Sequence, residues 1–119
     1  MQQSSYLLIN EKPIQILPSL VKLIGLNEAI ILQQIHSLLI DSKRLHTFHN
    51  HKACIDISLE ELKKYFPFFS FITVKITIKN LQRINIIFSK FDVHGTDIFR
   101  KNGFSINYEE LNKLQYQNK

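Results

Sequence analysis

Apolar residues between positions 26 and 40 recur so often that they cover almost every side of a helix. This pattern predicts a central, buried helix that begins at Asn27 as its N-cap and reaches about Asp41. Just before it, Pro18 favours the start of a short helix over residues 19–24, which Gly25 ends. We therefore expect two consecutive helices in the first third of the chain.

Alternation of apolar and polar residues indicates β-structure further along the chain. The clearest case is the short run from Ala53 to Ile57, where apolar and polar residues take turns. Later in the chain, two similar runs flank a sequence that is typical of a turn. We expect strands over residues 53–57, 86–91 and 100–106, with the turn at residues 92–95.

The remaining polar and short apolar segments lie at the ends of the chain and in its middle. Residues 6–10 and 14–17 are apolar runs, which predict either two strands or one extended arm. Residues 42–52 are polar and contain three of the five histidines, so we expect a loop there. Residues 107–111 are typical of the start of a short C-terminal helix, with a tail behind it.

Two serines stand where helices are expected to begin. Ser58 opens a Ser-Leu-Glu-Glu sequence, and Glu61 three positions later completes a capping box. The helix that follows should run to about Phe66, because Pro67 disfavours its continuation. Ser70 is the next N-cap candidate.

The segment from Phe71 to Arg83 fits two different structures. Residues 74–79 alternate and are rich in β-branched side chains, and this local pattern slightly favours a strand. Val74, Ile78 and Leu81 also fall on one side of a helix that Ser70 could cap. The residues alone therefore leave both structures open.

Composition narrows the classes of function. The chain has 119 residues, of which 45% are hydrophobic and 21% are charged, which suits one globular domain. The net charge of +5 and a pI of about 9.4 favour nucleic acid or another anionic surface as partner. With three glycines, a glycine-rich phosphate loop is not expected, and Cys54 alone forms no internal disulfide.

The most apolar stretch is too polar for a membrane span. Asn27, Glu28, Gln33, Gln34 and His36 interrupt it, as expected for a helix inside a globular protein. The first five residues lack the basic start and apolar run of a signal peptide. We therefore expect a cytoplasmic protein that makes no membrane contact.

Histidine and cysteine are concentrated in the middle of the chain, at His46, His49, His51 and Cys54. Zinc uses these ligand types, but the spacing matches no standard zinc module, so a plain polar loop is the favoured interpretation. No nucleotide-binding or metal-carboxylate motif occurs in the sequence. We expect no cofactor and no enzymatic activity.

Several sequence blocks resemble one family. They are Leu8-Ile9-Asn10-Glu11-Lys12-Pro13, Leu17-Pro18-Ser19-Leu20, the run from Gly25 to His36, Phe66-Pro67-Phe68-Phe69-Ser70, and the run from Ser105 to Leu111. In this order they resemble the winged-helix replication-initiation proteins and DnaD-like N-terminal domains of Gram-positive phages and plasmids. The resemblance implies an α+β, mainly helical winged helix-turn-helix fold. The implied domain organisation is a strand arm over residues 1–17, a winged-helix domain over 18–108 and a short C-terminal helix or tail over 109–119.

The resemblance also implies a DNA-binding surface. Phe71 to about Arg83 becomes a recognition helix for the major groove, and residues 86–106 become a two-stranded wing. Ser70 and the first backbone N–H groups of the helix would hold a phosphate. The residues expected to contact DNA are Ser70, Thr73, Lys75, Ile76, Lys79, Arg83, Lys90, His94, Arg100 and Lys101.

Ile72 and Ile76 depart from the family, which usually has small polar and basic residues at these positions. They are four residues apart and so share one helical face. Three interpretations stay open: packing against the arm or wing, a partner or dimer surface together with Tyr6 and Leu8, or contact with thymine methyl groups.

The sequence thus predicts a DNA-binding protein of a phage, plasmid or other mobile element, acting in replication initiation or transcriptional control. Duplex DNA is the expected partner, with single-stranded DNA as an alternative. The other hypothesis is an inhibitor or anti-defence factor that uses the same scaffold to block a host protein. A homodimer formed through the arm is compatible with both hypotheses.

Overall fold

Gly25 is the one residue between helices α2 (Pro18–Ile24) and α3 (Leu26–Ile40). Its N–H donates to the Val21 carbonyl, and its own carbonyl accepts from the Ala29 N–H. Its φ of 104° is a conformation that glycine adopts without strain. The predicted short helix is thereby confirmed. The predicted N-cap at Asn27 is wrong, because the turn at Gly25 lets α3 begin at once.

The computed structural model describes residues 13–41, 47–49, 52–89 and 101–117. Most of the predicted arm, including Tyr6 and Leu8, lies outside these residues. Residues 13–17 form neither helix nor strand and are exposed, so of the two alternatives for residues 14–17 the second strand is wrong, while an extended arm is not contradicted. Apolar side chains favour a strand only where a neighbouring strand can pair with the backbone.

The described strands form one antiparallel sheet in the order β1-β2-β4-β3. Strand β2 (Lys52–Ser58) confirms the prediction for residues 53–57, and β3 (Ile87–Ser89) and β4 (Lys101–Ile106) confirm the two later strands. The turn predicted at residues 92–95 lies outside the described residues. Strand β1 (Thr47–His49) corrects the prediction of a loop over 42–52, because it pairs with β2.

Both predicted serine caps are present. The Ser58 hydroxyl oxygen accepts from the Glu61 N–H at 3.1 Å, and a Glu61 carboxylate oxygen accepts from the Ser58 N–H at 3.2 Å. This capping box starts α4 (Leu59–Lys63), which ends before the predicted Phe66. The Ser70 side chain caps α5 (Phe71–Arg83), so the helix is the correct alternative for this segment.

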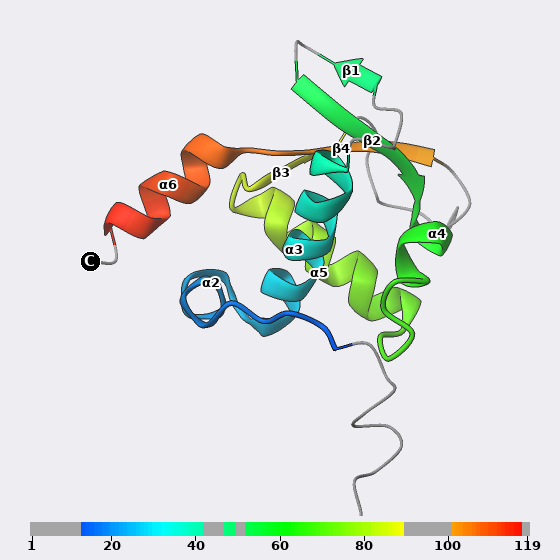
Figure 1. Cartoon of the computed structure of the whole chain (residues 1–119), viewed down its shortest axis with the longest axis horizontal. Coiled ribbons are helices and arrows are strands. Elements are labelled where there is room, and N and C mark those ends of the chain that lie inside the picture. The colour runs from blue at the N-terminus through cyan, green and yellow to red at the C-terminus, as the bar shows by residue number, and fades with distance from the viewer. Residues whose placement is uncertain (1–12, 42–46, 50–51, 90–100, 118–119) are drawn as a thin grey trace, which may run out of the picture.

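The sheet lies on one side of the core and the helices α3 and α5 lie on the other (Figure 1). Helix α3 packs against α2 and α5, and α4 packs against α5 and β2. Helix α6 (Tyr108–Gln117) projects from the end of β4 (Figure 1). The result is a compact, mainly helical α+β fold. The largest fully buried side chains are Ile31, Ile35, Ile55, Ile57, Leu62, Phe66, Val74, Ile78, Leu81, Ile86, Ile87 and Phe104.

No single helix in the described part of the chain is long and apolar enough to cross a membrane. Helices α2 and α3 reach that length and apolarity only as a pair, and the pair bends by 118° at Gly25. Most apolar side chains of α3 are buried in the core of the protein. They are Ile30, Ile31, Leu32, Ile35 and Leu38.

Candidate nucleic-acid interface

A cluster of phenylalanines sets the turn from which α5 starts. The Phe69 N–H donates to the Phe66 carbonyl at 2.9 Å, which closes the turn around Pro67. The rings of Phe68 and Phe69 meet edge to face with centroids 4.7 Å apart. Phe66 is buried in the core, so the cluster fixes the start of α5 relative to α4.

The inward face of α5 repeats at helical spacing. Val74, Ile78 and Leu81 are fully buried, and Thr77 is buried between them. The Thr77 hydroxyl donates to the Thr73 carbonyl at 2.7 Å, so burying this polar group costs little. Because this face packs against α3, the orientation of the opposite face is determined.

The opposite face carries what we call the α5 stripe, defined as Ile72, Lys75, Ile76, Lys79 and Arg83. These positions are three or four residues apart, so they lie along one side of the helix. Ile72 is 70% exposed and Ile76 is 53% exposed. These two side chains are therefore not part of the described core. Packing against the arm or wing, which lie largely outside the described residues, stays a prediction, as do the partner surface and the thymine contact.

The charge of α5 is entirely positive. Lys75, Lys79 and Arg83 are its charged residues, and its thirteen residues include no Asp or Glu. Lys63 of α4 adds a further cation, because its Nζ lies 5.2 Å from the centre of the Phe71 ring. Lys63 could not be predicted from the sequence, since its contact with Phe71 joins two helices across the phenylalanine turn and leaves no local pattern.

Arg83 is held at the C-terminal end of α5 by a chain of hydrogen bonds. One guanidinium nitrogen donates to Asn80 Oδ1 at 3.3 Å, and Asn80 Nδ2 donates to a Glu28 carboxylate oxygen at 3.1 Å. Glu28 belongs to α3, so the chain connects both helices. Arg83 remains exposed, with most of its five N–H donors left for an external acceptor.

Ser70 and Thr73 are less available than predicted. The Ser70 hydroxyl oxygen accepts from the Thr73 N–H at 3.1 Å, and the two hydroxyl oxygens are 3.0 Å apart. Their side chains thus bind each other at the start of α5. The backbone N–H groups of Phe71 and Ile72 have no partner within the helix, as in the first turn of any α-helix.

The predicted contacts from the wing cannot be placed in the same way. Lys90, His94 and Arg100 lie outside the described residues. Lys101 is the first residue of β4, and its side chain is not among those described. Of the ten predicted DNA contacts, the structure brings together four on the α5 stripe: Lys75, Ile76, Lys79 and Arg83.

The predicted histidine and cysteine cluster has little described structure. His46 and His51 lie outside the described residues, the side chain of His49 is not described, and Cys54 is buried. Within the described ranges, no three His, Cys, Asp or Glu side chains are grouped so that they could hold a metal ion.

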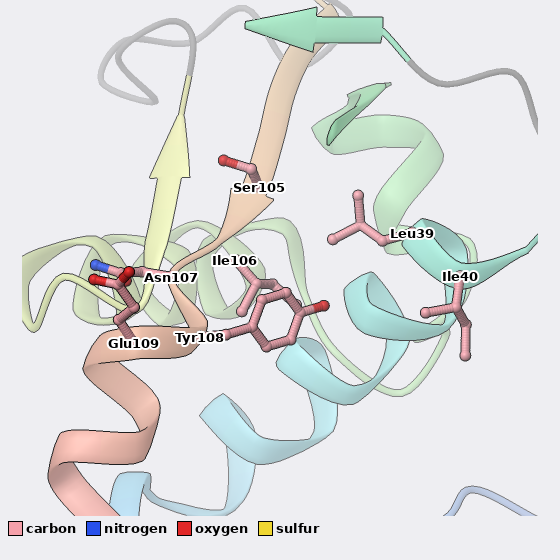
Figure 2. Close-up of a pocket in the computed structure, with 7 residues that line it drawn as sticks. All are labelled: Leu39, Ile40, Ser105, Ile106, Asn107, Tyr108 and Glu109. Carbon is pink, nitrogen blue, oxygen red and sulfur yellow. The ribbon is translucent and has the colours of Figure 1, made fainter. Parts of the chain in front are cut away.

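A cavity of about 460 Å³ lies between the end of α3 and the start of α6 (Figure 2). Leu39 and Ile40 face Ile106 and Tyr108 across it (Figure 2). The Tyr108 hydroxyl is 2.9 Å from Nδ1 of His36, and burial raises the pKa of Tyr108 above its ordinary value of 10.0. The lining is mainly apolar, and it shares no residue with the α5 stripe. Its full lining is Leu39, Ile40, Ser105, Ile106, Asn107, Tyr108 and Glu109.

Comparison with known proteins gives no family to which the chain can be assigned. No family model matches it, and no curated protein or solved structure gives a significant match. The geometry of the α5 stripe and the sequence resemblance are therefore the observations that bear on function.

Proposed function

We propose that this protein binds duplex DNA, with α5 as the recognition helix of a winged helix-turn-helix. The order of elements supports the proposal, because, apart from the additional strand β1 after α3, the elements α3, β2, α4, α5, β3 and β4 follow one another as in that fold. The sheet supports it as well, since β4 lies between β2 and β3. Helices α4 and α5 also pack together across a short turn, as the two helices of a helix-turn-helix do.

The α5 stripe is the observation that carries the proposal. This helix face has three cations, of which Arg83 is exposed and Lys75 and Lys79 are half-buried, and the helix has no anion. Such a face is suited to a groove lined by phosphates. An α-helix with its side chains is about 10–12 Å across, so the major groove, about 12 Å wide, admits it. The thirteen residues of α5 extend for about 20 Å along the helix axis. Lys63 increases the positive charge near the N-terminal end of α5, because it lies close to Phe71.

The biological task that we propose is replication initiation or transcriptional control in a phage, plasmid or other mobile element. This part of the proposal depends on the resemblance of the blocks around residues 8–13, 25–36 and 66–70 to winged-helix initiators. Duplex DNA bound by α5 is the step that both tasks share.

The test is fluorescence anisotropy with a labelled duplex of about two helical turns, measured at low and at physiological salt. The wild-type protein should bind at low salt and weaken as salt rises. The double variant Lys75→Glu, Lys79→Glu should bind at least tenfold more weakly. The matched control is Lys22→Glu, Lys113→Glu, which changes the net charge equally with exposed lysines of α2 and α6.

The control should keep most of the wild-type affinity. Equal losses in both double variants would mean that total charge, and not the α5 stripe, governs binding. Lack of binding by the wild-type protein at low salt would refute the proposal. An unlabelled single strand of the same sequence, added as competitor, should displace the duplex less well than unlabelled duplex does.

A protein partner is the second candidate, and the exposure of Ile72 and Ile76 favours it. Two neighbouring isoleucines that are more than half exposed are typical of a contact surface. In this case a host protein should be captured after nuclease treatment. The variant Ile72→Ser, Ile76→Arg should lose that capture, whereas Lys75→Glu, Lys79→Glu should keep it. Capture that is unchanged by the isoleucine variant would exclude this surface.

A further inference from the structure

The most exposed side chains in the first two turns of α5 are apolar, which is unusual for a DNA-binding helix. Ser70 and Thr73 use their hydroxyl groups on each other. The most exposed side chains in these turns are Ile72 and Ile76, which have no hydrogen-bonding group. If α5 enters the major groove, its leading half therefore presents branched apolar surface to the base edges.

We infer that Ile72 and Ile76 recognise thymine methyl groups, so that the DNA bound by α5 is rich in A·T pairs. The inference rests on the proposed DNA-binding function and specifies the class of sequence. In the major groove of unmodified DNA, the thymine C5-methyl is the apolar group that a base pair presents. An isoleucine placed against it buries apolar surface on both sides.

The same side chains disfavour G·C pairs. The major-groove edge of a G·C pair carries the O6 and N7 acceptors of guanine and the N4 amino group of cytosine. An isoleucine set against these atoms removes water from them and returns no hydrogen bond, which is unfavourable. The A·T edge carries polar atoms as well, N7 and the N6 amino group of adenine and O4 of thymine, so the thymine methyl is the group by which an isoleucine distinguishes the two pairs.

The spacing of the two isoleucines suits neighbouring base pairs. Four residues of α-helix rise about 6 Å, and successive base pairs are about 3.4 Å apart. Ile72 and Ile76 can therefore contact thymines one to two steps apart. Lys75 and Lys79 lie beside them on the α5 stripe, and lysine side chains are long enough to contact phosphates at the edges of the groove.

The positive charge of the α5 stripe favours DNA over an apolar protein patch as its binding partner. The two isoleucines are accompanied by Lys75, Lys79 and Arg83, and the helix has no acidic residue. A purely apolar partner would have to desolvate these cations, whereas DNA supplies phosphates to them. The mixture of apolar and cationic residues on one face is therefore complementary to a thymine-rich major groove.

The experiment compares duplexes that differ in one methyl group per base pair. An alternating A·T duplex is measured against the same duplex with deoxyuridine in place of thymidine, which leaves every hydrogen-bonding group in place. The wild-type protein should bind the thymine duplex more tightly, by about fourfold for each methyl group in contact. A G·C duplex should bind more weakly than the thymine duplex, and 5-methylcytosine should restore part of the affinity, because it places a methyl group at the same position.

Two variants connect the preference to the isoleucines. Ile72→Ala, Ile76→Ala should bind the thymine and uracil duplexes equally, and its circular dichroism should match the wild type because both positions are exposed. Ile72→Val, Ile76→Val keeps branched apolar side chains and should keep the preference. Both variants retain the cations of the α5 stripe, so both should still bind DNA.

The possible failures are distinguishable. Equal binding of the thymine and uracil duplexes by the wild type, with clear affinity for both, would overturn the inference and leave the DNA-binding proposal intact. A thymine preference that survives in the alanine variant would overturn it as well. Absence of binding to every duplex would overturn both. Nuclease-resistant capture of a protein that requires Ile72 and Ile76, together with equal thymine and uracil binding, would assign the pair to a protein partner.

Discussion

Gly25 determines at the scale of one residue how α2 turns into α3. Its φ of 104° is a region that other residues rarely adopt, and an added Cβ would lie 2.6 Å from Oε1 of Glu28. We expect Gly25→Ala to lower the free energy of unfolding by about 1–3 kcal/mol, because the new side chain brings both backbone strain and this close contact. Urea denaturation followed by circular dichroism measures the difference.

Asn27→Ala is the matched control for this prediction. Asn27 lies in the first turn of α3, and Gly25 occupies the N-cap position. Alanine has the higher helix propensity, so the free energy of unfolding should change by no more than about 0.5 kcal/mol. A loss as large as that of Gly25→Ala would show that α3 begins at Asn27 after all.

Tyr108 gives a prediction for the pH dependence of stability. Burial raises its pKa in the folded state, so the folded protein favours the neutral phenol. The contribution to stability is complete below pH 10 and is lost as the pH rises through the raised pKa. Tyr108→Phe should therefore lose less stability between about pH 9 and pH 11.5 than the wild type does. Urea denaturation across this range tests it, and identical pH profiles would contradict it.

At the scale of the element, α5 has two faces that the same substitution can distinguish. Ile78 is fully buried against the core, whereas Ile76 is 53% exposed. Ile78→Ala should lower the free energy of unfolding by about 2–5 kcal/mol, because it leaves a cavity. Ile76→Ala should change it by less than about 0.5 kcal/mol. Comparable losses in the two variants would mean that the outward face of α5 is packed.

Helix α5 also shows where the local sequence pattern misleads. The alternation over residues 74–79 favours a strand, but burial follows Val74, Thr77, Ile78 and Leu81, which is helical spacing. Thr77 makes this helical pattern hard to recognise in the sequence, because a polar residue is not expected at a buried position. In the structure it is buried, and its hydroxyl donates to the Thr73 carbonyl. Only the family resemblance led to the helix prediction for this segment.

Other elements were predictable to the extent that their causes were local. The capping box of Ser58 and Glu61 and the glycine stop at Gly25 depend on neighbouring residues, and both were predicted. Strand β1 depends on pairing with β2, which a polar histidine-rich segment does not indicate. The exposure of Ile72 and Ile76 depends on which face of α5 packs against α3, so the sequence left three interpretations open.

At the scale of the whole molecule, the net charge of +5 makes salt a direct probe of the proposed interface. Each phosphate that a cation neutralises contributes about 0.9 to the slope of log affinity against log salt. Lys79→Gln should therefore flatten the slope by about 1. Lys22→Gln removes the same charge from α2 and should leave the slope unchanged. Anisotropy titrations at several salt concentrations measure both, and equal flattening would place the contact elsewhere.

The central position of β4 has a consequence for how the chain folds as it is synthesised. In the sheet, Phe104 stands between Ile55 of β2 and Ser89 of β3, although it follows both of them along the chain. Helices α4 and α5 therefore leave the ribosome before the strand that completes the sheet. Contacts between such distant residues slow folding, and the pairing of β4 with β2 and β3 and its packing against α3 form only after the rest of the sheet has been synthesised. Folding should accordingly finish in one late, cooperative step rather than helix by helix.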